Sequence, residues 1–194
     1  KNNNEDLIIA LIRKIIDKKI KLDTNHSYPI SFNEIHLLYY IDLIFKSQIF
    51  DLLDEILDYS VVNFFNKEKS KFEILYDVSY KSDTSKIELL NYILNHKSEI
   101  DELLYFNILK DLSMLNSSTY SKFHNYFDEY LEIFKNHINI DSADILLFAV
   151  AIKHESDLGK IDKSLTLCSL IDTKIENIQD EELIFESLII YYWY

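Results

Sequence analysis

Apolar side chains recur at helical spacing along most of the chain, and short polar segments interrupt them. Leu7, Leu11 and Ile15 are three members of the first such series, which predicts a helix over residues 4–21. Later series predict helices over about 48–65, 70–80, 86–95, 99–115, 119–137, 142–154 and 157–171, one that ends near Phe45, and a last one that begins near Asp180.

Residues that favour helix N-termini precede several of these segments. Two combinations match a capping box, in which a Ser side chain and a Glu side chain three residues later satisfy each other's free N–H groups. The predicted caps are Ser31 with Glu34, Ser85 with Glu88, and the single residues Ser47, Asp141 and Ser156. We therefore expect about ten helices joined by short polar turns.

The composition supports helices over sheets. The 194 residues contain one Gly and one Pro, residues that sheet-rich folds need at turns and bulges. The chain is 48% hydrophobic and 27% charged, which is typical of a soluble globular protein. We predict an all-α fold of αα-hairpins in one domain over residues 1–194, arranged as a bundle or a degenerate helical-repeat array.

One segment recurs along the chain in similar form. KSQIFDLL at 46–53 resembles KSEIDELL at 97–104 and ESDLGKID at 155–162. With Ser47 aligned to Ser156, apolar residues of both flanking helices match, so residues 31–65 and 141–171 are candidates for a duplicated hairpin. The three Ser residues are spaced unevenly, however, and a Ser cap followed by an aliphatic residue is a common helix start. The pattern leaves generic hairpins and a duplicated unit both open.

The same periodicity predicts which side chains form the core of the two hairpins. We expect burial of Leu37, Leu38, Ile41, Leu52, Leu53 and Ile56 in the first, and of Leu146, Leu147, Val150, Leu158, Ile161 and Leu165 in the second.

The charge of the chain limits its partners. The formal net charge is −13, from 33 acidic and 20 basic residues spread along the sequence. Such a surface repels phosphates, which disfavours direct nucleic-acid binding, and attracts a basic protein partner. No apolar run reaches the roughly 20 residues of a membrane span. No stretch reads as a signal peptide, and a cytoplasmic location is the expectation.

The sequence offers little chemistry for catalysis. No Gly-rich phosphate loop is present, and Cys168 has no base near it in sequence. One possible metal site consists of three residues spaced one helical turn apart, His124, Asp128 and Glu132. Their imidazole nitrogen and carboxylate oxygens are metal-binding atoms, but a fourth ligand is missing. We expect these three residues to form a solvated helix face. The prediction is a protein that is not an enzyme and holds neither metal nor cofactor.

Aromatic residues and scattered acids mark the segments HLLYYIDLIF and IFDLLDEILDYSVVNFF, within residues 31–65. The pattern of aliphatic, aromatic and acidic residues in these segments resembles the helical immunity proteins that bacteria keep against polymorphic toxins. Residues 141–190 resemble those proteins less closely. That resemblance implies an acidic protein that neutralises a basic toxin by occluding its substrate cleft. The predicted partner-binding residues are Asp54, Glu55, Asp58 and Tyr59.

A second resemblance is to the helical-repeat regions of bacterial peptide-sensing regulators. It implies stacked hairpins whose concave face binds a short peptide. In this alternative, amide side chains would recognise the peptide backbone, with Asn91, Asn95 and Asn107 as candidates.

Overall fold

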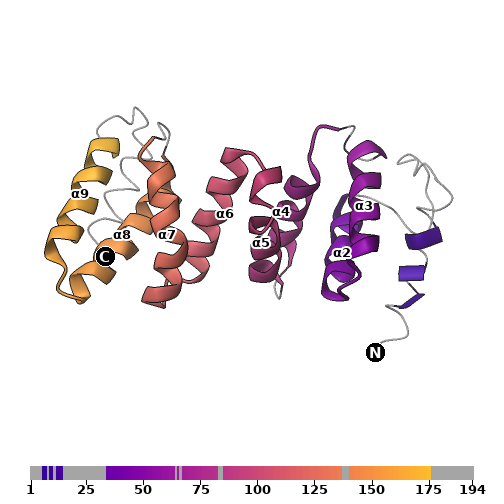
Figure 1. The fold of residues 1–194 in the computed structure, drawn as a ribbon, viewed down its shortest axis with the longest axis horizontal. Coiled ribbons are helices and arrows are strands. Elements are labelled where there is room, and N and C mark those ends of the chain that lie inside the picture. The colour runs from indigo at the N-terminus through magenta and orange to yellow at the C-terminus, as the bar shows by residue number, and fades with distance from the viewer. Residues whose placement is uncertain are drawn as a thin grey trace. The chain divides into compact units, whose positions relative to one another are not determined.

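The structure is a computed structural model that describes residues 6–7, 9–10, 12–14, 34–63, 65, 67–82, 85–136 and 140–175. The described part of the chain is helical and contains no strand, which confirms the predicted all-α fold (Figure 1). The elements are α2 (Glu34–Lys46), α3 (Phe50–Asn63), α4 (Lys71–Lys81), α5 (Lys86–Leu94), the 3₁₀ turn η1 (Lys97–Glu99), α6 (Glu102–Leu115), α7 (Tyr120–Phe134), α8 (Ser142–Asp157) and α9 (Ile161–Ile175).

The chain divides into two compact units, residues 1–100 and 101–194. In the first unit, α4 packs against α2, α3 and α5, and α2 also packs against α3. Aliphatic side chains dominate its core, and the fully enclosed ones include Ile41, Ile44, Leu53, Ile74, Leu75, Val78, Leu89, Leu90 and Ile93. The prediction of a single domain stays a prediction.

The second unit has an aromatic core. In it α6 packs against α7 and α8, and α8 packs against α9. The rings of Phe123, Phe127, Tyr130, Phe134 and Phe148 are all fully buried. The first four recur on α7 at intervals of three or four residues, so this helix presents one continuous aromatic face to its unit.

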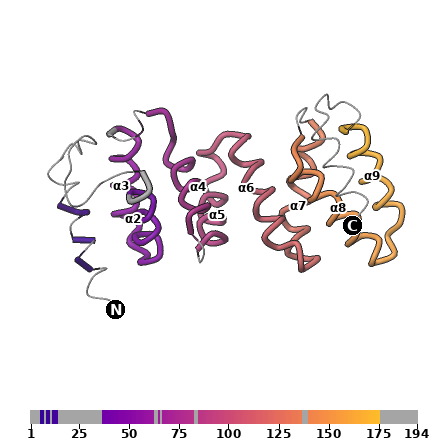
Figure 2. The backbone as a smooth tube through the Cα atoms, turned by 180° about the vertical axis from the view of Figure 1, so that it is seen from behind, coloured from indigo at the N-terminus to yellow at the C-terminus, as the bar shows by residue number. Residues whose placement is uncertain are grey.

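The α2–α3 and α8–α9 pairs form hairpins, visible from both sides of the molecule (Figures 1 and 2). Neither predicted Ser cap is correct. Ser47 lies in the turn before α3, which begins at Phe50, and Ser156 lies inside the last turn of α8. Ser98, in the middle copy of the segment, lies within η1, and the side chain of Asp101 caps α6 instead.

A C-terminal helix motif closes both hairpins. Residue Gln48 has φ 57° and Gly159 has φ 71°, the left-handed conformation that ends many helices. In each turn this residue donates to the carbonyl three positions back, and the next residue donates to the carbonyl five positions back. These are the two hydrogen bonds of a Schellman motif. The equivalent positions of the two hairpins are therefore Gln48 and Gly159, and not Ser47 and Ser156.

This register explains which core predictions were correct. All six core predictions for the first hairpin are confirmed, as is Leu147, whereas Leu146 and Val150 are half-buried. Burial of Leu158, Ile161 and Leu165 is wrong, because these three are 54%, 54% and 59% exposed. The alignment of Gln48 with Gly159 differs by two residues from that of Ser47 with Ser156, and in the correct register the buried face of α9 consists of Ser164, Leu167 and Ile171.

The remaining caps were partly correct. Asp141 caps α8 and forms a capping box with Asp144. The predicted box at Ser85 is wrong, because the Ser85 side chain makes no capping bond and donates to Asp42 instead. A box that the sequence analysis missed opens α4. The Ser31 cap, most of the first predicted helix and all of the last one lie outside the described residues.

Candidate functional site: an acidic pocket in the first unit

The four residues predicted to bind a partner lie on α3, but the structure groups only two of them. Asp54 and Asp58 are one helical turn apart and line a pocket. Glu55 and Tyr59 do not line it, because each successive residue of a helix is rotated by about 100° from the last. The site therefore keeps half of the predicted set.

We call this cavity the acidic pocket. It has a volume of about 410 Å³ and belongs entirely to the first unit. Its lining comes from α3, α4, α5, η1 and the residue before η1, and consists of Asp54, Leu57, Asp58, Lys71, Phe72, Leu75, Tyr92, His96 and Glu99.

Negative charge is in excess in the acidic pocket. The Lys71 ammonium lies 2.7 Å from the Asp58 carboxylate. Its hydrogen bond to Asp58 raises the pKa of Lys71 against the opposing effect of burial. Asp54 and Glu99 form no ion pair with any described residue. The lining holds the three carboxylates of Asp54, Asp58 and Glu99 against one ammonium, a formal charge of −2 with His96 counted as neutral.

Three rings are part of the lining of the acidic pocket. The ring centroids of Tyr92 and His96 are 4.7 Å apart, and those of His96 and Phe72 are 5.2 Å apart. Burial raises the pKa of Tyr92, and the nearby charges of Asp54 and Glu99 raise it further. The charges of Asp54 and Glu99 are therefore close enough to the Tyr92 ring to affect its ionisation. Carboxylates beside ring faces are favourable surroundings for an organic cation.

Sequence reasoning missed most of this lining. The further lining residues come from α4 (Lys71), α5 (Tyr92), η1 (Glu99) and the residue before η1 (His96), at distances along the chain that no spacing rule connects. The two acids on α3 were identifiable because i and i+4 positions share a helix face. The other side chains were brought to them by the packing of α4 against α3 and α5.

The structure shows no peptide site formed by the three Asn residues of the alternative prediction, among the residues that it describes. The Asn91 amide donates to the Ile87 carbonyl within α5, and Asn95 is the C-cap of that helix. Asn107 lies on α6 in the second unit.

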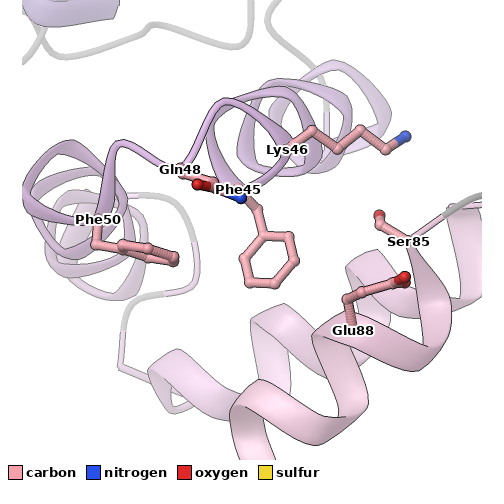
Figure 3. A pocket seen from close by; sticks show the side chains of 6 residues that line it. All are labelled: Phe45, Lys46, Gln48, Phe50, Ser85 and Glu88. Atoms are coloured by element: carbon pink, nitrogen blue, oxygen red, sulfur yellow. The ribbon is translucent and has the colours of Figure 1, made fainter.

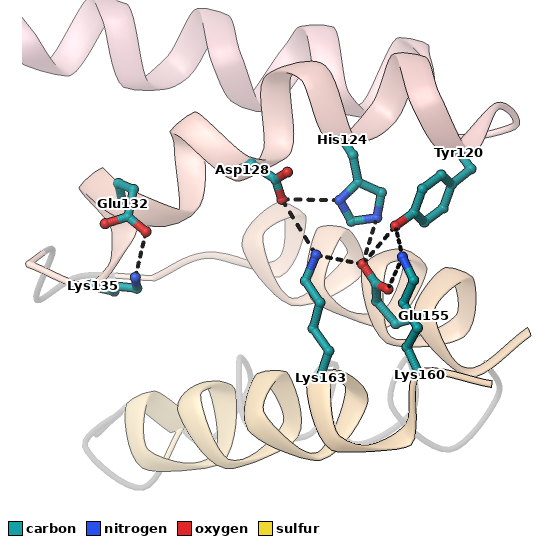
Figure 4. Close-up of polar contacts among 8 residues, drawn as sticks. All are labelled: Tyr120, His124, Asp128, Glu132, Lys135, Glu155, Lys160 and Lys163. Carbon is teal, nitrogen blue, oxygen red and sulfur yellow. Dashed lines mark hydrogen bonds and ion pairs between the residues drawn. The ribbon is translucent and has the colours of Figure 1, made fainter. Parts of the chain in front are cut away.

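A polar cluster in the second unit corrects the expectation for His124 (Figure 4), whereas Asp128 and Glu132 are exposed as expected. His124 is 7% exposed and does not lie on a solvated face. Its Nδ1 lies 3.1 Å from an Asp128 oxygen, and its Nε2 lies 3.3 Å from Glu155 Oε1. Glu132 pairs with Lys135 instead.

Glu155 on α8 is the centre of this polar cluster. Its side chain is 0% exposed, and Lys163 Nζ lies 2.7 Å from Oε1. The Tyr120 hydroxyl donates to Oε1 over 3.2 Å and accepts from Lys160 Nζ over 2.6 Å. Lys160 also approaches Oε2, at 3.3 Å.

The cluster links α7, α8 and α9 through one buried carboxylate. Burial alone would raise the pKa of Glu155, but hydrogen bonds from Lys163 and Lys160 outweigh it and lower the pKa. The carboxylate is therefore ionised at neutral pH, enclosed, and shared among side chains from α7, the turn before α9, and α9. Among the described residues, no group of three or more His, Cys, Asp or Glu side chains is arranged to hold a metal ion.

None of the described helices combines the length and the hydropathy of a membrane span. Comparison of the chain with protein-family models, curated proteins and solved structures gave no significant match, so the geometry of the acidic pocket and the charge of the chain carry the functional interpretation.

Proposed function

We propose that this chain is a protein-binding protein, not an enzyme, and that its acidic pocket receives a basic side chain of a protein partner. The observation that carries the proposal is the pocket itself. Asp54 and Glu99, two carboxylates without an ion-pair partner in the part of the chain that the structure describes, lie beside the ring of Tyr92 in a cavity of about 410 Å³.

A Lys or Arg side chain fits the chemistry of this pocket. Its aliphatic stem would contact the half-buried rings of Phe72 and Tyr92, while its charged head would meet the carboxylates. A cation over an aromatic face gains about 0.5–2 kcal/mol, depending on how far it is desolvated. Arg matches better than Lys, because its planar head stacks on rings and bonds carboxylates in pairs.

The charge of the whole chain acts in the same direction. A net charge of −13 accelerates encounter with a basic partner and disfavours acidic ones. The more specific proposal is that the partner is a basic toxin whose substrate cleft the chain occludes. Its support is this charge and the resemblance of residues 31–65 to helical immunity proteins.

Affinity capture with matched variants tests the proposal. The immobilised chain, the Asp54→Asn/Glu99→Gln variant and an Asp162→Asn/Asp172→Asn control are incubated with extract of the native source and with the purified product of the adjacent gene. Both variants lose two negative charges, but Asp162 and Asp172 are exposed on α9, in the other unit.

We expect a basic protein that binds the native chain and the α9 control at low salt and is lost from the pocket variant. Raising the ionic strength should weaken its binding, because exposed charge pairs are screened beyond roughly 10 Å at 0.1 M salt. Equal capture by the native chain and the pocket variant would refute the role of the acidic pocket.

A further inference from the structure

A second cavity lies beside the acidic pocket in the first unit. It has a volume of about 340 Å³ and is lined by Phe45, Lys46, Gln48, Phe50, Ser85 and Glu88 (Figure 3). We call it the Phe50 pocket. The rings of Phe45 and Phe50 form its apolar part, and the polar ends of Lys46, Ser85 and Glu88 lie at its other side (Figure 3).

One stack of aromatic rings separates the two cavities. Phe50 lines the Phe50 pocket and Tyr92 lines the acidic pocket, and their rings are stacked with centroids 5.7 Å apart and planes 4° apart. The Phe45 ring meets the same Tyr92 ring edge-on at 5.5 Å. Two neighbouring side chains of a single bound segment can therefore occupy the two pockets on either side of this stack.

Local hydrogen bonds hold the Phe50 pocket in shape. The Schellman motif at Gln48 fixes the turn between α2 and α3, and with it the position of Phe50. Ser85 donates to the Asp42 carboxylate over 2.6 Å, which ties the start of α5 to α2. Asp42 also pairs with Lys46 at 2.5 Å. A site that is already ordered loses less conformational entropy when it binds.

The exposed ring of Phe50 offers an apolar surface to a bound segment. The Phe50 side chain is 44% exposed, although aromatic rings contribute most to interfaces when they are buried. Because the adjoining pocket is acidic, the charge complement is a partner segment that also carries a basic residue.

We propose that the two pockets form one bipartite site for a protein segment that carries an Arg or Lys side chain and a nearby aliphatic or aromatic side chain. The basic side chain enters the acidic pocket, and the apolar one packs on Phe45 and Phe50. This inference rests on the proposed function, and it adds the apolar half of the recognised motif.

Short blocked peptides test the inference without knowledge of the natural partner. The probes contain Arg alone, Leu alone, or Arg and Leu separated by zero to three Ser residues, and a matched series carries Glu in place of Arg. Binding to the native chain is measured by calorimetry and by two-dimensional NMR. We expect one Arg–Leu spacing to bind at least about tenfold more tightly than the Arg-only peptide, and the Glu series not to bind.

Variants assign each half of the motif to its pocket. Phe50→Ala should remove the gain that Leu adds over the Arg-only peptide, both measured on the same variant, whereas Asp54→Asn/Glu99→Gln should remove the Arg contribution. Tyr39→Ala is the control, because Tyr39 is 57% exposed on α2 and lines neither pocket. If Phe50→Ala does not fold, Glu88→Trp blocks the pocket from its rim, with Glu88→Gln as the control for charge.

The outcomes separate this inference from the proposed function. If a basic protein is captured through Asp54 and Glu99 while Leu adds less than about twofold to Arg binding, the proposed function stands and the bipartite site is wrong. If the native chain is a dimer that Phe50→Ala dissociates, a second copy covers the ring, and the inference is overturned. If no Arg peptide binds and no basic protein is captured, both are wrong.

Discussion

Glu155 shows how a charged residue is kept in a helical core. Its side chain has no exposure, yet Lys163, Lys160, Tyr120 and His124 all approach its carboxylate. A buried carboxylate is strongly disfavoured unless such partners compensate its lost hydration. The two lysines keep part of their side chains in water, so the cluster joins the core to the surface.

The first prediction concerns removal of this carboxylate. Glu155→Ala should lower the free energy of unfolding by about 1–3 kcal/mol, because Tyr120 and His124 lose a buried partner while the lysines can be rehydrated. Urea denaturation followed by circular dichroism measures the change. Glu132→Ala is the control and should cost less than about 1 kcal/mol, since its pair with Lys135 is exposed. Equal losses in the two variants would contradict the structural role of the cluster.

The second prediction concerns acid. Burial and the neighbouring His124 lower the pKa of His154, although Asp157 and Glu155 oppose them. The unfolded chain therefore binds more protons than the folded one below the ordinary His pKa of about 6.5, so stability should fall as the pH drops through this range. The lowered pKa of Glu155 has the same sign, with its loss at more acidic pH.

Thermal melts between pH 7.5 and 5 measure this dependence. We expect the melting temperature of the native chain to fall on acidification, and that of His154→Gln to fall less. Burial raises the pKa of Asp144, which acts in the opposite direction but is the same in both proteins. Identical slopes for the native chain and the variant would exclude His154 as the cause.

At the scale of elements, helix starts decide which residues face the core. A register error of two residues between the hairpins turned the predicted buried face of α9 to solvent, because two residues rotate a helix face by about 200°. In the first hairpin the predicted start of α3 was also early, but apolar residues line both sides of its buried stripe. Leu52, Leu53, Ile56 and Leu57 are all buried there.

The third prediction follows from this difference. Leu52→Ala and Leu147→Ala should each cost about 2–5 kcal/mol of unfolding free energy, since both side chains are fully buried and truncation leaves a cavity. Leu165→Ala should change it by less than about 0.5 kcal/mol, because Leu165 is on the exposed face of α9. Chemical denaturation of the three variants is the measurement. A large loss for Leu165→Ala would mean that its face is covered.

The fourth prediction concerns the turns that close the two hairpins. Gly159→Ala should destabilise by about 1 kcal/mol, because a side chain disfavours φ 71° even though a Cβ there would have no atom within 4 Å. Gln48→Gly should stabilise or be neutral, since it relieves the same strain at φ 57°. Thermal denaturation of both variants checks the pair. If both substitutions shift stability in the same direction, the two turns do not share this conformation.

At the scale of the whole molecule, the two units have different interiors. The first is mainly aliphatic and contains the acidic pocket and the Phe50 pocket, and the second has the aromatic face of α7 and the Glu155 cluster. Each unit therefore has a core of its own, which is the usual condition for independent unfolding.

The fifth prediction tests that independence. Leu52→Ala should increase amide hydrogen exchange in α2–α5 and leave exchange in α6–α9 unchanged, because local stability follows the unit that loses the contact. Hydrogen–deuterium exchange with mass spectrometry resolves the two halves, and Leu147→Ala should give the mirror-image result. Increased exchange throughout the chain in both variants would instead support a single cooperative domain.

The sequence by itself determined the secondary-structure class and most of the helices. Helical periodicity and the scarcity of Gly and Pro act locally, so they can be recognised without tertiary contacts. The acidic character and the α3 pair Asp54 and Asp58 were likewise visible, because one helix brings them together.

Only the tertiary structure decided the sites. The acidic pocket includes Lys71, Tyr92 and Glu99, which come from elements other than α3. The Ser85 hydroxyl donates to Asp42 on α2 and does not make its predicted capping hydrogen bond. His124 became a core residue because α8 places Glu155 against it. Such outcomes depend on which helix faces meet, and side chains from distant segments carry no signal of that meeting along the chain.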